Sequence, residues 1–221
     1  MKNFIIKYKH GIPMLVYLVF YLVWFSYIEK TVTKHYHVIH MAVDDYIPFC
    51  EVFIIPYLLW FLYVVVSVLL TMFTDKEEYY KLCTVLVTGM TLFLVISTLW
   101  PNGHHLRPQI MPRNNIFTQL IAGLYQTDTA TNLWPSIHVY NSLAAHFAIN
   151  RSRVLQKYPL ARYGSLILAI SIILSTMLIK QHSVFDVLTA FILSAVMYYI
   201  VYMRNIQFHF RVSRKNKPQT D

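Results

Sequence analysis

The sequence predicts an all-α membrane protein: a bundle of six transmembrane helices, with an interfacial helix in the outer loop between the third and fourth spans. Three observations lead to this prediction. Hydrophobic residues make up 57% of the 221 residues and charged residues 13%, a more apolar balance than that of globular proteins. The mean hydropathy is +0.46. The apolar residues form continuous runs without the period-two alternation of barrel strands, so each run is expected to be helical.

Six runs approach the roughly 20 residues that a helix needs to cross the hydrocarbon of a bilayer. The first is too long for the core of a signal peptide and no small-residue cleavage site follows it, so we interpret it as an uncleaved span. The run from Val52 to Phe73 carries no charge and is the strongest. The fourth is the weakest because it carries Ser136, His138, Asn141 and His146. The predicted spans cover residues 11–29, 50–73, 82–100, 134–150, 163–179 and 184–203.

The distribution of lysine and arginine predicts the orientation of these spans. Of the 19 basic residues, 14 fall in segments on the side of the two termini and the remaining 5 on the opposite side. Basic residues are retained on the cytoplasmic side, so we expect a multi-pass protein of the cell membrane with both termini in the cytoplasm. Residues 205–221 then form a basic cytoplasmic tail, and the 101–137 loop and the 180–183 turn share the extracytoplasmic side.

Within the long outer loop, the segment NNIFTQLIAGLY has apolar residues on one helical face: Ile116, Phe117, Leu120, Ile121 and Leu124. This pattern predicts a short helix that lies on the membrane surface. A helix packed on the bundle would show the same pattern.

The net charge of +9 does not indicate nucleic-acid binding. The basic residues occur in short groups between apolar runs, and no nucleic-acid-binding motif accompanies them. We interpret them as determinants of topology that also attract anionic lipid headgroups, so the bilayer is the expected partner.

Three polar groups stand out at the outer ends of the spans. His182 and Asp186 are one helical turn apart, so the carboxylate can fix one imidazole nitrogen and leave the other free as a nucleophile or base. Lys180 adds a cation just before them. The alternative is that the pair only satisfies its own polar groups and the lysine anchors the chain at the interface.

The second group is Pro135, Ser136 and His138, at the predicted start of the fourth span. Free N–H groups and the helix dipole make such a position an anion site, where a hydroxyl and an imidazole can hold a phosphate and donate a proton. A capping serine and an interfacial histidine are the alternative. The third group is Arg107, since a guanidinium is a bidentate phosphate ligand. His104 and His105 lie beside it and would add a further hydrogen-bond donor, whereas a position on the loop surface explains both histidines without a role in binding.

The order of these groups resembles the type-2 phosphatidic acid phosphatase superfamily, whose motifs are K-x6-RP, PSGH and SR-x5-H-x3-D. The resemblance covers about residues 95–200. It matches Arg107-Pro108 to the first motif and the segment from Pro135 to His138 to the second. Ser175, His182 and Asp186 match the third.

The chain departs from these motifs at three positions. Trp100 stands in place of the lysine of the first motif, Ile137 in place of the glycine of the second, and Thr176 in place of the arginine of the third. Lys180 lies one turn beyond Thr176, and we expect its side chain to substitute for the missing arginine.

The resemblance implies a membrane lipid phosphatase that acts at the extracytoplasmic face through a phosphohistidine, without metal or other cofactor. His182 would attack phosphorus, Asp186 would orient its ring, and His138 would protonate the leaving alcohol and then activate water. The oxygens of the transition state would be neutralised by Arg107, Lys180 and Ser136.

Two other functions stay open at this point. A phosphotransferase related to the sphingolipid-head-group synthases would use the same phosphohistidine and pass the group to a lipid alcohol. A non-enzymatic transporter of lipid or anion would use the histidines as a proton or anion site, but no broken-helix pair or two-half symmetry supports it.

Overall fold

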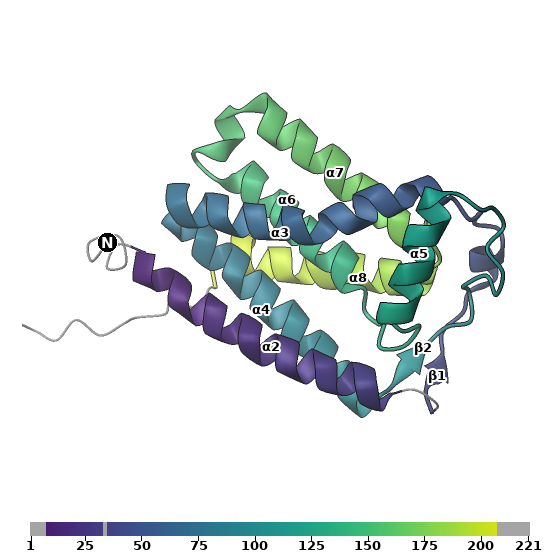
Figure 1. Ribbon diagram of the computed structural model, residues 1–221. Coiled ribbons are helices and arrows are strands. Elements are labelled where there is room, and N and C mark those ends of the chain that lie inside the picture. Colours follow the sequence, from purple (N-terminus) through teal and green to yellow (C-terminus); the bar gives the residue numbers. More distant parts are fainter. Residues whose placement is uncertain (1–7, 33–34, 207–221) are drawn as a thin grey trace, which may run out of the picture.

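The computed structural model describes residues 8–32 and 35–206, so most of the predicted basic tail, residues 207–221, lies outside the described residues. Seven α-helices dominate the described part (Figure 1): α2 Ile12–Thr31, α3 Ile54–Thr74, α4 Lys76–Leu99, α5 Ile116–Thr127, α6 Ile137–Arg151, α7 Pro159–Leu178 and α8 Val184–Tyr198. Short 3-10 turns lie at Lys9–Gly11, Ala42–Asp45, Glu51–Phe53 and Leu155–Lys157, and a π turn at Tyr199–Met203 extends α8. The all-α fold is confirmed.

Five helical segments are long and apolar enough to cross a membrane, as expected of a multi-pass membrane protein. They correspond to the first, second, third, fifth and sixth predicted spans: Lys9–Thr31, Glu51–Thr74, Lys76–Leu99, Pro159–Leu178 and Val184–Met203. Large apolar side chains on their outer faces are solvent-exposed in the isolated chain, which is the surface that lipid would cover.

The fourth predicted span, α6, differs from the other five. Its 15 residues extend for about 22 Å, less than the roughly 30 Å of a bilayer core. It packs against α3, α4, α7 and α8, so it lies at the centre of the bundle. Its buried residues include three alanines and a serine, whose small side chains let the neighbouring helices approach closely: Ala144, Ala145, Ala148 and Ser142.

One contact fixes α6 against α4. The ring of Tyr140 lies over Gly89, where an added Cβ would sit 2.0 Å from the ring carbon Cε1. The hydroxyl of Tyr140 donates to the carbonyl of Val85 at 2.8 Å, so the ring cannot swing away without losing that bond. Tyr140 is two residues from His138, so this contact also sets the rotation of α6 at the candidate site.

Helix α4 begins six residues before the predicted start of the third span. Asp75 caps it by accepting a hydrogen bond from the backbone N–H of Glu78 at 3.2 Å. Lys81 and Glu77 form an i,i+4 ion pair at 2.9 Å on the added turn. The apolar run could not show this extension, because capping and ion pairing rather than hydropathy hold the first turn.

The 35–53 and 100–136 segments meet at one end of the bundle, on the right of Figure 1. Strand β1, His37–Val38, pairs in parallel with β2, Asn102–Gly103. The 101–137 loop reaches the α7–α8 turn through His104, whose Nε2 lies 2.9 Å from the carbonyl oxygen of Gln181. The prediction that these two segments share a side is confirmed.

One face of helix α5 packs against the helix bundle. Its buried residue Ile121 contacts an apolar cluster with Ile54 of α3 and Ile179 of the α7–α8 turn. Its other face leaves Ile116 67% exposed and Leu120 47% exposed. Of the two interpretations of its apolar pattern, packing on the bundle is therefore shown for one face, while the other face is available to a membrane surface.

We predict that Gly89→Ala lowers the melting temperature of the protein in detergent. The new methyl group would overlap a ring that its own hydrogen bond holds in place, and over-packing of this kind costs about 1–3 kcal/mol. Gly164→Ala in α7 is the matched control, because nothing lies within 4 Å of the added methyl group. A melting temperature for Gly89→Ala equal to that of the control would contradict the proposed contact.

Candidate functional site

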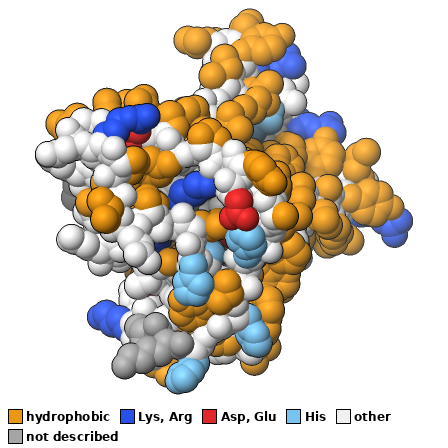
Figure 2. All heavy atoms as spheres, turned by 90° about the vertical axis from the view of Figure 1, so that its right-hand side faces the viewer, with side chains coloured by type: hydrophobic (Ala, Val, Ile, Leu, Met, Phe, Trp, Pro, Cys, Tyr) orange, Lys and Arg blue, Asp and Glu red, His pale blue; other side chains and the backbone are white. Residues whose placement is uncertain are grey.

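The candidate site lies at the end of the bundle where the outer loops meet. Figure 2 looks onto this end and shows histidine side chains gathered on it, together with isolated charged ones. The residues predicted for the site come from the 101–136 loop, the start of α6, the turn between α7 and α8, and the first turn of α8.

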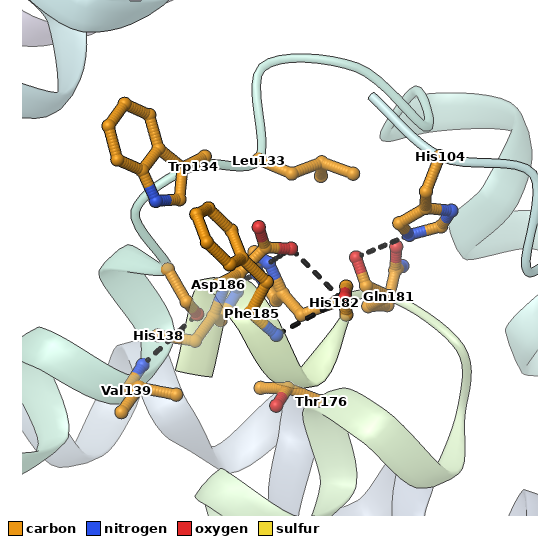
Figure 3. Close-up of polar contacts among 12 residues, drawn as sticks. His104, Leu133, Trp134, His138, Val139, Thr176, Gln181, His182, Phe185 and Asp186 are labelled. Atoms are coloured by element: carbon orange, nitrogen blue, oxygen red, sulfur yellow. Dashed lines mark hydrogen bonds and ion pairs between the residues drawn. The ribbon is translucent and has the colours of Figure 1, made fainter. Parts of the chain in front are cut away.

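His182 is held from both sides (Figure 3). Its backbone N–H donates to the carbonyl of Thr176 at 3.0 Å. Its ring Nδ1 lies 3.3 Å from Oδ2 of Asp186. Helix α8 begins only at Val184, with Ser183 as the N-cap, so the pair spans the start of a helix rather than a turn within one.

Asp186 stabilises the start of α8 in addition to contacting His182. Its Oδ2 accepts the backbone N–H of Ser183 at 3.0 Å, while the hydroxyl of Ser183 accepts the N–H of Phe185 at 3.2 Å. This reciprocal arrangement is a capping box, and it fixes the carboxylate. The carboxylate can therefore hold one tautomer of His182, with Nδ1–H donated to Asp186 and the lone pair on Nε2.

His138 completes a row of three side chains. Its Nδ1 lies 3.3 Å from Nε2 of His182. The ring of Tyr57 stacks on His138 with a centroid distance of 4.6 Å, and Trp60 packs against it at 4.2 Å. Asp186, His182 and His138, three of the residues predicted from the sequence, are thus brought together.

Burial, together with the positive charge of Arg107, lowers the pKa of His182 to about 3. The imidazole is therefore neutral at physiological pH. A neutral ring with its Nδ1–H engaged presents a lone pair at Nε2, which is the form that a nucleophile or base requires.

Arg107 lies beside this row, but most of its donors are already engaged. Its Nη1 donates to the carbonyl of Asp128 at 2.7 Å, and its Nη2 donates to the carbonyl of Thr129 at 2.9 Å and to Oε1 of Gln181. The guanidinium also stacks over the ring of Tyr125, 4.4 Å from its centroid. Among the described residues its buried Nε has no partner.

Ser136 is the N-cap of α6, and its hydroxyl oxygen accepts the N–H of Val139 at 3.4 Å. Its backbone N–H points to the carbonyl of Asp186 at 3.4 Å, which ties the start of α6 to α8. The capping interpretation of Ser136 therefore has direct support. Because the helix begins at Ile137, Pro135 precedes the helix instead of occupying its first turn.

Lys180 is turned towards a different loop. Its ammonium donates to the carbonyls of Asp44 and Ile47 at 2.9 and 2.6 Å, and its backbone has a φ of 52°. It lines a polar hollow on the outer face with Asp45, His40 and His105. These contacts fix the α7–α8 turn to the 41–47 loop. They offer no support for the expectation that Lys180 replaces the missing arginine.

Gln181 is the residue that the sequence reasoning missed beside His182. It is buried, its side-chain oxygen accepts from Arg107, and its Nε2 has no partner among the described residues. Nothing in a lone glutamine signals this role, apart from its position next to the histidine.

Asp44 is a second residue of the site that could not be identified from the sequence. Its Oδ1 accepts the N–H of Val184 at 2.8 Å, and its Oδ2 accepts the hydroxyl of Ser183 at 2.6 Å and the N–H of Met41 at 2.8 Å. It lies about 140 residues before Ser183 and Val184, so no local pattern could have indicated these two contacts.

His104 and His105 have different environments. His104 is buried, with Nε2 donating to the carbonyl of Gln181 and Nδ1 accepting the N–H of Leu106 at 3.2 Å. Burial is the main cause that lowers the pKa of His104 to about 4, against the opposing effect of the hydrogen bond to the carbonyl of Gln181. His105 is exposed, so the surface interpretation holds for it and fails for His104.

A cavity of about 510 Å³ adjoins His138. Its walls come from α2, α3, α4, α5 and α6, and Glu29, Asp128 and His138 lie among its lining residues. Some of the apolar lining residues also face outwards: Leu15 is 64% exposed and Phe61 60% exposed. The cavity is thus open sideways, between α2 and α3, on the surface that lipid would cover.

No group of three or more histidine, cysteine, aspartate or glutamate side chains within residues 8–32 and 35–206 is arranged to hold a metal ion. No family model, curated protein or solved structure matches the chain. The resemblance to the type-2 phosphatidic acid phosphatases therefore rests on the motif residues, and their geometry is the basis for a proposed function.

We predict that His104→Gln makes stability less dependent on pH. The unfolded chain binds a proton at His104 near its ordinary pKa of 6.5, whereas the folded protein resists protonation down to about 4. Wild type should therefore lose stability as the pH falls from about 6.5 to about 4. Thermal unfolding of His104→Gln across this range should show a shallower decline.

His105→Gln is the control, because that exposed ring has no comparable environment. His182 and Asp128 titrate in all three proteins, so the comparison isolates His104. Equal slopes for wild type and His104→Gln would show that His104 is not held neutral by the fold.

Proposed function

We propose that this protein is an integral-membrane phosphatase that hydrolyses a lipid phosphate or diphosphate ester at the extracytoplasmic face. The observation that carries the proposal is the continuous row from Asp186 through His182 to His138. This row adjoins an apolar cavity that opens towards the surrounding lipid. A lipid tail can occupy the cavity while its phosphate reaches the histidines.

In the first step, Nε2 of His182 attacks phosphorus and the bond from phosphorus to the lipid oxygen breaks. His138, which has taken up the acidic proton of the bound phosphate monoanion, gives that proton to the departing alkoxide, so the lipid leaves as an alcohol and His138 becomes neutral. The 3.3 Å contact between the rings opens as the phosphoryl group enters between them. Asp186 stabilises the positive charge that develops on the ring of His182.

In the second step, His138 accepts a proton from water, and the hydroxide attacks the phosphohistidine. The phosphorus–nitrogen bond breaks, which releases inorganic phosphate and restores neutral His182. Both steps use the same general acid and base, so no further titratable residue is required.

The phosphate oxygens would be bound by Arg107 and Gln181. Each has a buried N–H group without a partner among the described residues: Nε of Arg107 and Nε2 of Gln181. Hydrogen bonds to a charged phosphate are strong and would satisfy both. Gln181, rather than Lys180, then takes the place that the family gives to the arginine at Thr176.

The membrane arrangement follows from the same proposal. We take α6 as a sixth, central span that neighbouring helices shield from lipid, with its N-terminus at the extracytoplasmic face and the termini of the chain in the cytoplasm. The outer face of α5, with Ile116 and Leu120, would rest on the membrane surface.

We predict that detergent-purified protein releases inorganic phosphate from a lipid phosphate in the presence of EDTA. His182→Ala and Asp186→Asn should each reduce the rate by about 100-fold or more, because the first removes the nucleophile and the second its orienting charge. His138→Ala should slow both steps, since it removes the proton donor for the leaving alcohol and the base that activates water.

His105→Ala, on the exposed neighbour of His104, is the control for histidine removal near the site. Size-exclusion profiles and melting temperatures establish that each variant is folded. Wild-type rates in folded His182→Ala would exclude the mechanism, and product formation only when a lipid alcohol is supplied would show a phosphotransferase.

We further predict that Gln181→Met raises KM for the lipid phosphate by about 10-fold, since a hydrogen bond to a charged group is lost. Lys180→Asn should leave KM unchanged and lower the melting temperature, because it removes the bonds to the 41–47 loop while asparagine tolerates a positive φ. The opposite pattern, with KM raised by Lys180→Asn alone, would restore Lys180 as the phosphate ligand.

A further inference from the structure

Arg107 is a partly buried cation to which no carboxylate is bound directly. Among the described residues, its guanidinium donates to backbone carbonyls of the 125–129 segment and to the side chain of Gln181. None of the ion pairs within the same residues includes it. A charge removed from water is costly unless other charges or dipoles compensate it, so the compensation must come from groups further away.

A single peptide group joins Arg107 to the carboxylate of Glu29. The carbonyl oxygen of Asp128 accepts from Nη1 of Arg107 at 2.7 Å. On the other side of the same peptide bond, the N–H of Thr129 donates to Oε1 of Glu29 at 2.7 Å. Hydrogen bonds in such a chain polarise one another, so the negative charge of Glu29 strengthens the bond that the carbonyl accepts from Arg107.

Glu29 also fixes the direction of the guanidinium. The carbonyl of Thr129 accepts from Nη2 of Arg107 at 2.9 Å, and the hydroxyl of Thr129 is a second donor to Oε1 of Glu29. In the same segment, Thr131 donates to the carbonyl of Val32, just beyond α2, at 3.0 Å. The end of α2 therefore holds the segment whose carbonyls orient Arg107, and Figure 1 shows it at the same end of the bundle as α5.

This indirect compensation suits an arginine that binds phosphate. A carboxylate bound directly to the guanidinium would compete with phosphate for its donors. Glu29 acts from the far side of the 128–129 peptide group, so it stabilises the cation without occupying its donors. Burial lowers the pKa of Arg107, and the negative charges of Asp128 and Glu29 oppose this shift.

We propose that Glu29 is a positioning residue for phosphate binding: through the 128–129 peptide group it orients Arg107, stabilises its charge and so increases the affinity of the site for phosphate oxygens. The inference rests on the proposed function for the role of Arg107. It adds α2, a helix that carries none of the motif residues, to the elements on which the site depends.

The test is the change Glu29→Gln in the full-length protein, which removes the charge but keeps an oxygen that can accept the N–H of Thr129. We expect KM for diacyl phosphatidic acid to rise about 5-fold or more with kcat within about 2-fold of wild type, because members of one hydrogen-bond network are energetically coupled. Glu77→Gln is the matched control, since Glu77 pairs with Lys81 and Arg153 at the start of α4, and it should leave KM unchanged.

A second variant covers the case in which Glu29→Gln does not fold, as judged by its melting temperature. Thr129→Val keeps the backbone and the size of the side chain and removes only the hydroxyl bond to Glu29. It should raise KM in the same direction by about 2-fold or more, because one donor to the carboxylate is lost. Wild-type KM in this variant and in Glu29→Gln would overturn the inference.

A double-mutant cycle shows whether Glu29 acts through Arg107. Arg107→Lys keeps the charge but lacks the planar fork that reaches both carbonyls. In the Arg107→Lys background, Glu29→Gln should change KM by less than about 2-fold, because the group on which it acts is already displaced. If the effects of the two substitutions multiply, Glu29 acts independently of Arg107 and the inference fails.

A binding measurement separates this inference from the proposed function. The rise in melting temperature with increasing inorganic phosphate reports the affinity of the site for the anion without any reaction. Glu29→Gln should weaken this affinity about 5-fold or more, and Glu77→Gln should leave it unchanged.

The two measurements then fail independently. If no lipid phosphate is hydrolysed but Glu29→Gln weakens the binding of inorganic phosphate, the phosphatase function fails and the role of Glu29 stands. If lipid phosphate is hydrolysed while KM and the affinity for inorganic phosphate are both unchanged in Glu29→Gln, the function stands and the inference fails.

Discussion

The carboxylate of Asp44 holds the start of α8, and the position of the paired histidines depends on it. It accepts the backbone N–H of Val184 and the hydroxyl of Ser183, two donors at a helix N-terminus where negative charge is favourable. The carbonyl of the same residue receives the ammonium of Lys180. His182 lies between Lys180 and Ser183 in the sequence. The loop from Met41 to Ile47 therefore hydrogen-bonds to the chain on both sides of His182.

This arrangement also explains why the α7–α8 turn can be buried. The N–H groups of Gln181 and His182 both reach the carbonyl of Thr176, and the hydroxyl of Tyr125 donates to the carbonyl of Ile179 at 2.6 Å. With Asp44 and Asp186, these bonds satisfy the turn within the protein. Burial in turn lowers the pKa of His182 and keeps its ring neutral. The protonation state of this ring therefore depends on the hydrogen bonds that allow the surrounding backbone to be buried.

The sequence was sufficient for the parts that short-range patterns determine. Hydropathy located the long helices, and the spacing of His182 and Asp186 with the proline before His138 located the residues that meet at 3.3 Å. The parts it could not predict depend on contacts between distant segments. Ser183 and Val184, which bind the carboxylate of Asp44, lie about 140 residues away from it in the sequence. The ammonium of Lys180 turns to the 41–47 loop because the carbonyls of Asp44 and Ile47 are available there. The cavity is likewise formed by the packing of five helices, which no single run of residues could indicate.

The sideways opening of that cavity has a consequence for how the protein should be studied. Side chains of α2 and α3 form its rim and face outwards, so in a bilayer the remaining wall is made of neighbouring lipid molecules. The width and chemical character of the cavity are then shared between the chain and its host membrane. Detergent replaces that wall with a different material, so selectivity among lipids is best measured in vesicles or nanodiscs of defined composition.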